Sequence, residues 1–266
     1  MSTAYALRDS STMLRRNLRR MRRYPSTTLF QVLLPVVFLL LFVYVFGATL
    51  GNGLAQMAVG RAGYANYVAP AIIVLTVAGG ATGTAISVAT DMNEGIIDRF
   101  RTMAIWRPSV LAGHVVAAMI QTFVAVAVVV AVAVGVGFHP GAGMLGWLAT
   151  IGVVAMITLA MTWIGVALGL AAKGLESASN TPMLLMLLPF LGSGFVPTAS
   201  MPAGLRQFAT YQPFTPFTDS IRGLLEGGPV GDQVMVSAAW CAGIVIVGYV
   251  WSVRRYSRGP RVPPAP

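Results

Sequence analysis

The chain has 266 residues, of which 56% are hydrophobic and 10% charged, and its formal net charge is +10. Soluble globular domains carry about 25% charged residues, so this composition cannot provide a water-soluble exterior and predicts a membrane protein. Seven arginines precede Pro25 and four follow Trp251, and both groups flank apolar stretches. This placement favours orientation in a membrane and attraction to anionic lipid over nucleic-acid binding. The single cysteine, Cys241, excludes an internal disulfide.

Residues 1–25 are predicted to form an amphipathic helix at the cytoplasmic membrane surface. Arginines cover most of this helix, and one face is apolar. That face carries Leu7, Ser11, Leu14, Leu18 and Met21. Pro25 and Ser26 then end this segment and begin the first span.

Six apolar stretches are long enough to cross a bilayer, whose core of about 30 Å needs roughly 20 helical residues. Their interiors contain no Lys, Arg, Asp or Glu, and they lack the alternation of a membrane barrel. The predicted spans are 29–49, 67–90, 110–138, 144–172, 182–200 and 234–253. We therefore expect an all-α polytopic fold with a transmembrane domain at 26–253 and a tail at 254–266.

The basic residues define the orientation of these spans. Fifteen lie in the N-terminal segment, the loop at 91–109, the loop at Lys173 and the C-terminal tail, and three lie in the other loops. Because positive charge stays inside, both termini are predicted to be cytoplasmic. Arginine accounts for 17 of the 18 basic residues. This usage is typical of a GC-rich bacterium, so we expect a bacterial inner membrane.

The fifth span and the region after it are irregular. Pro189 and Pro197 interrupt the span, with Gly192 and Gly194 between them, and 201–231 is rich in proline and aromatics. Irregular backbone at membrane depth must be buried in protein or line a cavity. We expect two re-entrant half-helices, at 203–211 and 214–225, on the extracytoplasmic side. A helical loop lying on the lipid surface is the alternative.

The sequence lacks the common motifs of catalysis and of energy coupling. The only lysine, Lys173, is followed by Gly174 and Leu175, so a P-loop cannot form. No H-E-x-x-H or G-x-S-x-G motif occurs, and His114 and His139 are predicted on opposite sides of the membrane. All eight carboxylates fall outside the predicted spans, which leaves an ion gradient no evident point of action. We expect no enzyme activity and no cofactor in this chain.

Polar and small residues within the spans allow two interpretations. The polar ones are expected to form interhelical hydrogen bonds, although they could contact a substrate. They are Gln31, Thr76, Thr82, Thr84, Ser87, Gln121, Thr158 and Thr162. The pairs Gly79/Gly83 and Gly165/Gly169 fit close helix packing in lipid. Interfacial aromatic anchors are expected at Tyr24, Tyr64, Tyr67, Trp147 and Trp251.

The cytoplasmic loop at 91–109 is unusually apolar. Asp91, Glu94 and Asp98 share one helical face, and a second face is apolar and contains Ile97 and Phe100. A short helix with an apolar knob for a partner's groove would need such residues. A membrane-hugging loop is the alternative.

Two segments resemble the ABC-2 type permeases, and within them the daunorubicin/doxorubicin-resistance type. The first is 91–109, whose core reads Glu94-Gly95-Ile96-Ile97-Asp98-Arg99-Phe100-Arg101. The second runs from Gly194-Phe195-Val196-Pro197 through Met201-Pro202 and Gln212-Pro213-Phe214-Thr215-Pro216 to Ile221-Arg222. Two positions depart from the family. Members often have Pro-Gly where this chain has Pro70-Ala71, and Leu-Pro or Met-Pro where it has Met103-Ala104.

The resemblance implies one permease of an exporter, in which two such chains, alike or paralogous, dock on two copies of an ATPase that binds ATP and Mg²⁺. Substrates would be hydrophobic drugs, polyketide-like metabolites or lipids. The predicted ATPase contact is Glu94, Gly95, Ile97, Asp98, Arg99 and Phe100. The predicted external gate is Phe195, Pro197, Pro213, Phe214, Pro216 and Arg222. A non-transporting membrane scaffold and an ion-independent facilitator are the rival functions.

Overall fold

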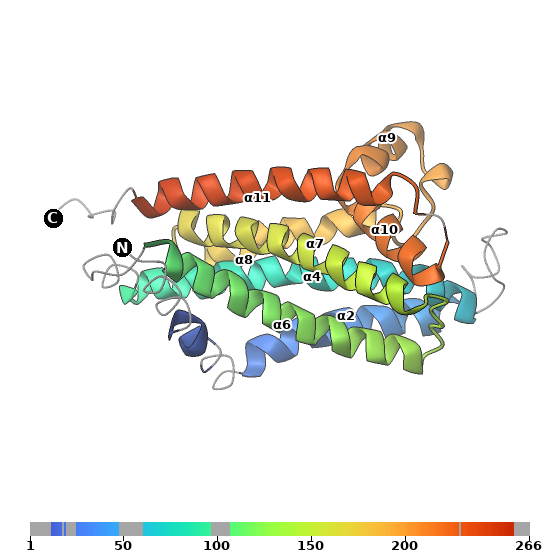
Figure 1. Cartoon of the computed structure of the whole chain (residues 1–266), viewed down its shortest axis with the longest axis horizontal. Helices are drawn as coiled ribbons and strands as arrows, with labels where there is room; N and C mark the ends of the chain where they lie inside the picture. The colour runs from blue at the N-terminus through green and yellow to red at the C-terminus, as the bar shows by residue number, and fades with distance from the viewer. Residues whose placement is uncertain are drawn as a thin grey trace.

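The computed structural model describes residues 12–17, 19, 25–47, 61–96, 107–228 and 230–257, and these form an elongated helical bundle (Figure 1). No strand occurs in these ranges. The helices are α2 (Pro25–Leu40), continued by the π-helical η1 (Leu41–Phe46), then α4 (Arg61–Asn93), α6 (Arg107–Gly135), α7 (Met144–Ala171), α8 (Leu175–Leu187), η2 (Leu188–Leu191), η3 (Thr198–Ser200), α9 (Ala203–Tyr211), α10 (Phe214–Glu226) and α11 (Gln233–Ser257).

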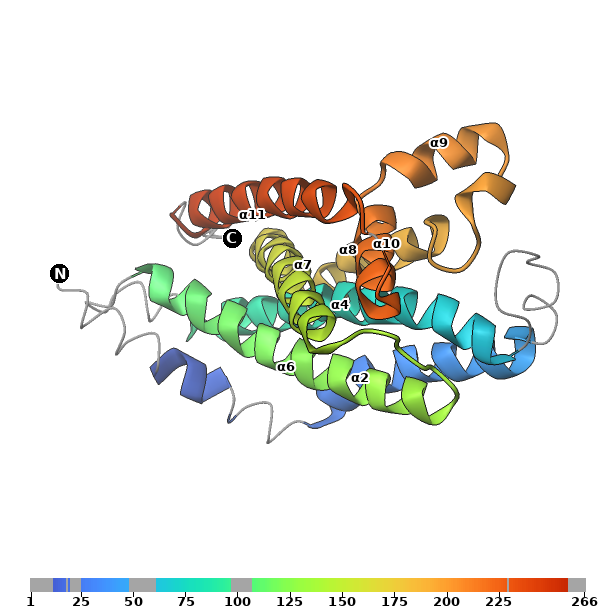
Figure 2. The same cartoon turned by 45° about the vertical axis from the view of Figure 1, so that its right-hand side comes forward.

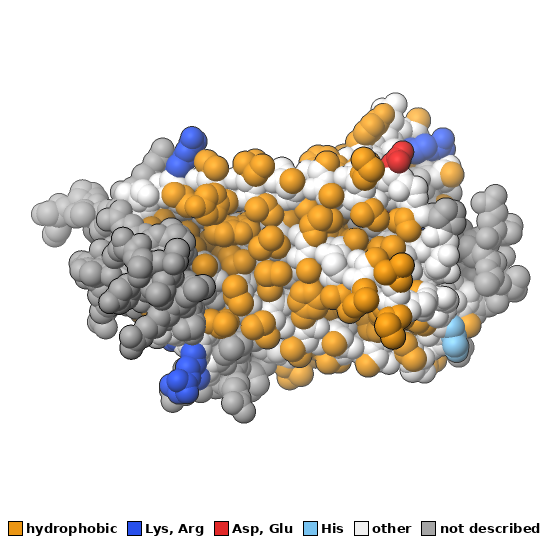
Figure 3. Space-filling model, viewed as in Figure 1, with side chains coloured by type: hydrophobic (Ala, Val, Ile, Leu, Met, Phe, Trp, Pro, Cys, Tyr) orange, Lys and Arg blue, Asp and Glu red, His pale blue; other side chains and the backbone are white. Residues whose placement is uncertain are grey.

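Five helical segments in the described part of the chain are long and apolar enough to cross a membrane. They are Thr28–Phe46, Ala62–Asn93, Leu111–Gly135, Met144–Ala171 and Gln233–Ser257. Each coincides with one of the six predicted spans. Figure 3 shows the matching surface, a broad band of hydrophobic side chains between charged groups near the two ends.

The predicted fifth span, at 182–200, is not among these five, and the helical segment found there lies earlier in the sequence. Its helix begins at Leu175, continues from α8 into η2, and stops at Gly192, where the backbone is extended. Thirteen α-helical and four 3₁₀ residues reach about 28 Å, close to a bilayer core. Hydropathy missed the beginning because the first two turns are polar, with Glu176 at the helix N-terminus, where the helix dipole favours a carboxylate.

Helix α4 is the central element of the bundle. It packs against α2, α6, α7, α8 and α10, and Figures 1 and 2 show it running through the middle. Its most apolar window is 72% buried, compared with 17% for α2 and for α11. A helix that is apolar on all sides belongs inside a bundle, and alanine and glycine on α4 let its neighbours approach closely.

Two glycines of α7 make the crossing with α4 possible. A Cβ on Gly165 would lie 2.5 Å from the carbonyl oxygen of Ala81, and one on Gly169 would lie 2.6 Å from that of Ala85. The predicted close packing is thus confirmed for this pair. It is wrong for Gly79 and Gly83, where a Cβ would meet only side-chain atoms at ordinary distances.

Leucine at position 165 or 169 is therefore expected to destabilise the bundle. Overpacking against backbone costs about 1–3 kcal/mol, which should lower the melting temperature of the purified protein in detergent. Gly152→Leu is the matched control on the same helix, since a Cβ at Gly152 meets nothing within 4 Å. Equal melting temperatures for all three variants would contradict this account of the crossing.

The bundle has two distinct ends. The first, called here the arginine-rich end, brings together residues 12–17, the C-terminal ends of α4 and α11, and the beginning of α6 (Figure 1). The second, called here the α9–α10 end, carries α9 and α10, and α9 stands out from the bundle (Figure 2).

The segment 12–17 is helical, but its buried face is not the predicted one. Met13 and Asn17 are buried, Leu14 is half-buried, and Arg15 is exposed. The face rotates toward Met13 because this segment packs on α6 instead of lying only on lipid. Leu7, Ser11, Leu18 and Met21 lie outside the described residues.

Candidate functional site

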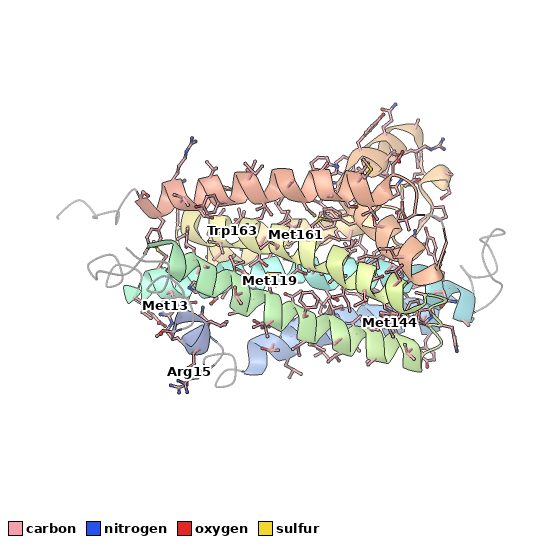
Figure 4. All side chains as sticks on the ribbon, viewed as in Figure 1. Met13, Arg15, Met119, Met144, Met161 and Trp163 are labelled. Carbon is pink, nitrogen blue, oxygen red and sulfur yellow. The ribbon has the colours of Figure 1, made fainter. Side chains whose placement is uncertain are left out.

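A cavity of about 1470 Å³ lies at the arginine-rich end. Residues from the N-terminal segment, α2, α4, α6 and α8 line it. Figure 4 shows Met13 beside α6 and Arg15 directed away from the bundle at this end. Its apolar wall includes Phe30, Leu34, Pro35, Ile86 and Met186, and its neutral polar wall includes Gln31, Thr82, Ser87, Thr90 and Gln121. Such a mixture suits an apolar ligand that carries a few hydrogen-bonding groups.

The two glutamines of the cavity wall connect helices, as predicted. Gln31 Nε2 donates to Thr122 Oγ1 at 3.2 Å, and Gln121 Nε2 donates to Thr28 Oγ1 at 3.0 Å. Thr82 differs from them, because its hydroxyl is buried and has no hydrogen-bond partner among the described residues. A buried unpaired hydroxyl is unfavourable, so Thr82 is a candidate contact for a ligand in the cavity.

The prediction of interhelical bonds is wrong for four threonines. Each donates to the carbonyl four residues earlier in its own helix, at distances between 2.6 and 2.8 Å. They are Thr76, Thr84, Thr158 and Thr162. A threonine hydroxyl within a helix satisfies itself in this way when no partner helix offers an acceptor.

A buried ionic cluster borders the cavity. Asp91 is 1% exposed and forms an ion pair with Arg16, and His114 Nε2 lies 3.2 Å from Asp91 Oδ2. The prediction had placed Asp91 outside the spans, on a face shared with Glu94. It lies instead within the last turn of α4. Its side chain is buried there because residues of the N-terminal segment and of α6 cover it.

The predicted ATPase contact begins where α4 ends. The amide of Gly95 donates to the carbonyl of Met92 at 3.1 Å, and φ at Gly95 is +68°. This left-handed conformation suits glycine and stops the helix. Glu94 is exposed just before it. Ile97, Asp98, Arg99 and Phe100 lie outside the described residues.

The two half-helices after the fifth span occur as α9 and α10, with nearly the predicted bounds. Helix α10 packs against α4, α7 and α11, and it buries Phe214, Phe217, Ile221 and Leu225 almost completely. Helix α9 buries only Ala209. The pair thus divides into one helix inserted among the others and one at the surface.

Phe195, a predicted gate residue, belongs to an aromatic cluster. Its ring stacks on Phe190 with centroids 4.7 Å apart, and it lies 4.6 Å from Phe42 of η1. Phe38 contacts Phe190 edge to face at 5.4 Å. These contacts, of a kind that stabilises aromatic pairs beyond burial alone, join α2 to the chain after the fifth span.

The predicted gate prolines mark where helices begin. Pro197 precedes η3 and Pro213 precedes α10, positions where a missing N–H costs nothing. Pro216 is buried in the first turn of α10. These prolines therefore determine where η3 and α10 begin.

Arg222 is the centre of a polar clamp at the α9–α10 end, formed with Tyr67, Ser193 and Asp219. Its Nη1 donates to Asp219 Oδ1 at 2.7 Å, and its Nη2 donates to the carbonyls of Tyr67 and Ser193, both at 3.2 Å. Its guanidinium carbon lies 4.0 Å from the centre of the Tyr67 ring. Ser193 Oγ also donates to Asp219 at 2.7 Å, and the Tyr67 hydroxyl donates to the Ser193 carbonyl at 2.6 Å.

The expected role of two aromatic residues as interfacial anchors is wrong. Tyr64 is fully buried and Tyr67 is 8% exposed, so neither is an interfacial anchor. Asp219, Ser193 and Tyr67 are absent from the predicted gate residues. The sequence offered one signal for the pair, a carboxylate three residues before an arginine in an amphipathic helix.

The cavity and the clamp lie toward different ends of the bundle, so the cavity belongs to the arginine-rich end alone. None of the residues that line the cavity belongs to the aromatic cluster or to the clamp. Between them, α4 is packed with fully buried residues such as Val68, Ile72 and Leu75. No cluster of three or more His, Cys, Asp or Glu side chains suited to a metal occurs in the described ranges.

Comparisons with known proteins agree with this architecture. The chain is 28% identical, over 95% of its length and 87% of the relative's, to a daunorubicin resistance ABC transporter permease protein of Streptomyces coeruleorubidus. It is 26% identical, over 90% of its length and 85% of the relative's, to a probable doxorubicin resistance ABC transporter permease protein of Mycobacterium tuberculosis. Residues 9–225 match the family described as ABC-2 type transporter. The chain therefore belongs to the ABC-2 type transporter family and is a multi-pass membrane protein.

Proposed function

We propose that this chain is the membrane-spanning permease subunit of an ATP-binding cassette exporter of the bacterial inner membrane. The observation that carries the proposal is the cavity of about 1470 Å³ at the arginine-rich end, whose lining includes neither the aromatic cluster nor the clamp at the α9–α10 end. A transporter that alternates between two sides needs an accessible site behind a closed barrier.

The arginine-rich end is the cytoplasmic one in this proposal. It carries Arg254 and Arg255 at the end of α11, and most basic residues of the sequence belong to segments that lead to it. If α8 and η2 together cross the membrane as the fifth span, the chain has six crossings and both termini are cytoplasmic. Helices α9 and α10 then form the extracytoplasmic gate, with α10 as its re-entrant part.

The energy comes from a separate ATPase, which binds ATP and Mg²⁺. The chain has no P-loop, and its described carboxylates lie at the ends of the bundle. Glu94 and Gly95, together with Ile97, Asp98, Arg99 and Phe100, contact this ATPase. Glu94 is exposed and α4 ends before the left-handed Gly95, so this end of α4 is accessible to a partner, which supports this role.

A second permease chain, alike or paralogous, completes the cavity. The apolar faces of α2 and α8 flank the cavity and are exposed at Leu33, Val37, Met183, Leu184 and Leu187. Phe30 and Leu34 of α2 and Met186 of α8 belong to the cavity wall itself. A partner against these two helices would cover apolar surface and close the cavity toward lipid at once.

The substrate is a hydrophobic drug, metabolite or lipid. The part of the cavity wall that α2 and α6 contribute supports this class, because it offers the amides of Gln31 and Gln121 beside apolar side chains such as Phe30 and Leu34. The names of the two relatives refer to daunorubicin and doxorubicin resistance, which supports a substrate of the size of these drugs.

Alanine at both Glu94 and Arg99 tests the proposal. The double variant should insert normally and lose ATP-driven efflux of daunorubicin from cells that co-express the ATPase, by at least about tenfold. The purified wild-type chain should retain the ATPase, and hydrolysis should depend on both proteins. Undiminished efflux by the double variant, or a wild-type chain that purifies without any ATPase, would refute the proposal.

A further inference from the structure

The ion pair of Arg16 and Asp91, with His114 Nε2 3.2 Å from the carboxylate, brings three parts of the chain together. Arg16 belongs to the N-terminal segment 12–17, Asp91 to the last turn of α4, and His114 to the beginning of α6. Helices α4 and α6 are the two that flank the segment proposed to contact the ATPase. The cluster therefore lies at the base of that segment and connects both of its supports to a third element.

A second contact fastens the N-terminal segment at the same place. A Cβ on Gly113 would lie 2.6 Å from the Cβ of Met13 and 3.3 Å from its carbonyl carbon. Met13 is 7% exposed. Glycine at 113 thus lets the segment approach the backbone of α6, one residue before His114.

The burial of Asp91 makes this connection energetically demanding. A carboxylate that is 1% exposed loses its hydration, and only nearby cationic or hydrogen-bonding groups compensate for the loss. Arg16 supplies that compensation from the N-terminal segment. Any displacement of the α4 end must either carry Arg16 along or leave the carboxylate without this partner, so intermediate positions are disfavoured.

The N-terminal segment is also a wall of the cavity. Thr12, Arg15, Arg16, Asn17 and Arg19 all line it. A movement passed to this segment would therefore change the cytoplasmic mouth of the cavity directly. The N-terminal segment therefore has two separate properties: it is attached to the helices that flank the proposed ATPase contact, and four of its six residues belong to the cavity wall.

We propose that Asp91 is a positioning residue that locks the N-terminal segment to α4 through Arg16, while the contact of Met13 with Gly113 holds this segment on α6. ATPase movement then closes or opens the cavity mouth through the segment. The inference rests on the proposed function. The bond between Arg16 and Asp91 is the transmitting contact, and the close approach at Gly113 keeps the segment in register.

Nucleotide-dependent labelling of a cavity cysteine tests the inference without a known substrate. Ser87→Cys is placed in the cavity wall on a Cys241→Ser background, and the complex with the ATPase is reconstituted in proteoliposomes. A membrane-impermeant maleimide is added to the ATPase side, with and without ATP and vanadate. The wild-type labelling rate should fall about tenfold with nucleotide, as expected for a site closed by an allosteric change.

The labelling ratio is the rate without nucleotide divided by the rate with ATP and vanadate. Asp91→Asn and Arg16→Gln should each reduce this ratio from about tenfold to below about twofold, while basal ATP hydrolysis and co-purification of the ATPase persist. The double variant should match the single ones, because the two residues act as one unit. Arg16→Lys should keep most of the ratio. Arg254→Gln, which removes an exposed charge at the same end of the bundle, is the matched control and should behave as wild type.

Each remaining outcome is decisive. A full ratio in Asp91→Asn would overturn the inference and leave the proposed function standing. A ratio of one in the wild-type complex would overturn the proposed function and the inference with it. If Asp91→Asn does not fold, Gly113→Ala displaces the segment through Met13 without removing a charge, and it must also lose the ratio.

Discussion

Replacement of Arg222 by alanine is expected to open the α9–α10 end of the bundle. The change removes donors from Asp219 and from the carbonyls of Tyr67 and Ser193, and it removes the cation that faces the Tyr67 ring. Hydrogen bonds to charged groups contribute about 1.5–3 kcal/mol, so a closed state held by this clamp should lose its advantage over an open one.

Cysteine labelling measures this opening directly. Thr218 of α10 is 1% exposed, so Thr218→Cys should be protected from an impermeant maleimide added outside the cell. In the Arg222→Ala variant its labelling rate should rise at least about tenfold, which corresponds to 1.4 kcal/mol. Arg222→Lys should be intermediate, because an ammonium cannot serve three oxygens in the geometry of a guanidinium.

The matched control for this experiment is Arg206→Gln on α9. Arg206 lies at the same end and donates to the carbonyls of Ala199 in η3 and of Met201, and these bonds do not reach α4 or α10. It should leave Thr218→Cys protected. Protection that survives in Arg222→Ala would show that the clamp does not hold this end closed.

Phenylalanine at Gly83 is expected to block transport by occupying the cavity. A Cβ at Gly83 meets only Gln31 Oε1, at 3.8 Å, so the backbone tolerates a side chain there. The larger ring must then extend into the space between α2 and α4, where Gly83 is exposed to the cavity. Efflux of daunorubicin should fall at least about tenfold, whereas ATPase binding should not change, since the blocked region lies away from Glu94.

Gly243→Phe provides the control for bulk and hydrophobicity. Gly243 lies on α11, none of whose residues lines the cavity, and a Cβ there meets nothing within 4 Å. It should leave efflux at the wild-type rate. A Gly83→Phe variant that transports normally would show that this cavity is not on the substrate path.

The features that the sequence predicted correctly are those written in local patterns. Apolar length alone located five spans, because lipid demands a minimum helix length. The proline and glycine positions around Gly192 and Pro213 located α9 and α10 almost to the residue, because these residue types favour turns and helix ends.

The features that it did not reveal depend on partners far apart in the chain. Arg16 and Asp91 are separated by 75 positions, and Arg222 and Tyr67 by 155. No periodicity or spacing within a helix identifies such partners. Asp91 looked like a solvated loop residue because the elements that bury it come from other segments.

Helix contacts explain the remaining differences. Tyr67 has the composition of an interfacial anchor, and only the turn at Ser193 and the position of α10 place it inside the protein. The beginning of α8 was missed because its polar turns fail a hydropathy criterion, although α4 and α7 pack against this helix. A pattern of small residues likewise indicated a close crossing on α7 but not which positions of α4 it meets.

The most direct test of the whole account is a pair of cryo-EM structures of the chain co-purified with its ATPase, without nucleotide and with ATP and vanadate. The account predicts two permease chains on two ATPase subunits, with the cavity accessible at the arginine-rich end and the clamp at Arg222 closed when nucleotide is absent. With ATP and vanadate, the cavity mouth should be closed and the N-terminal segment displaced. A cavity of unchanged shape in both states, or a chain that assembles without any ATPase, would contradict the account.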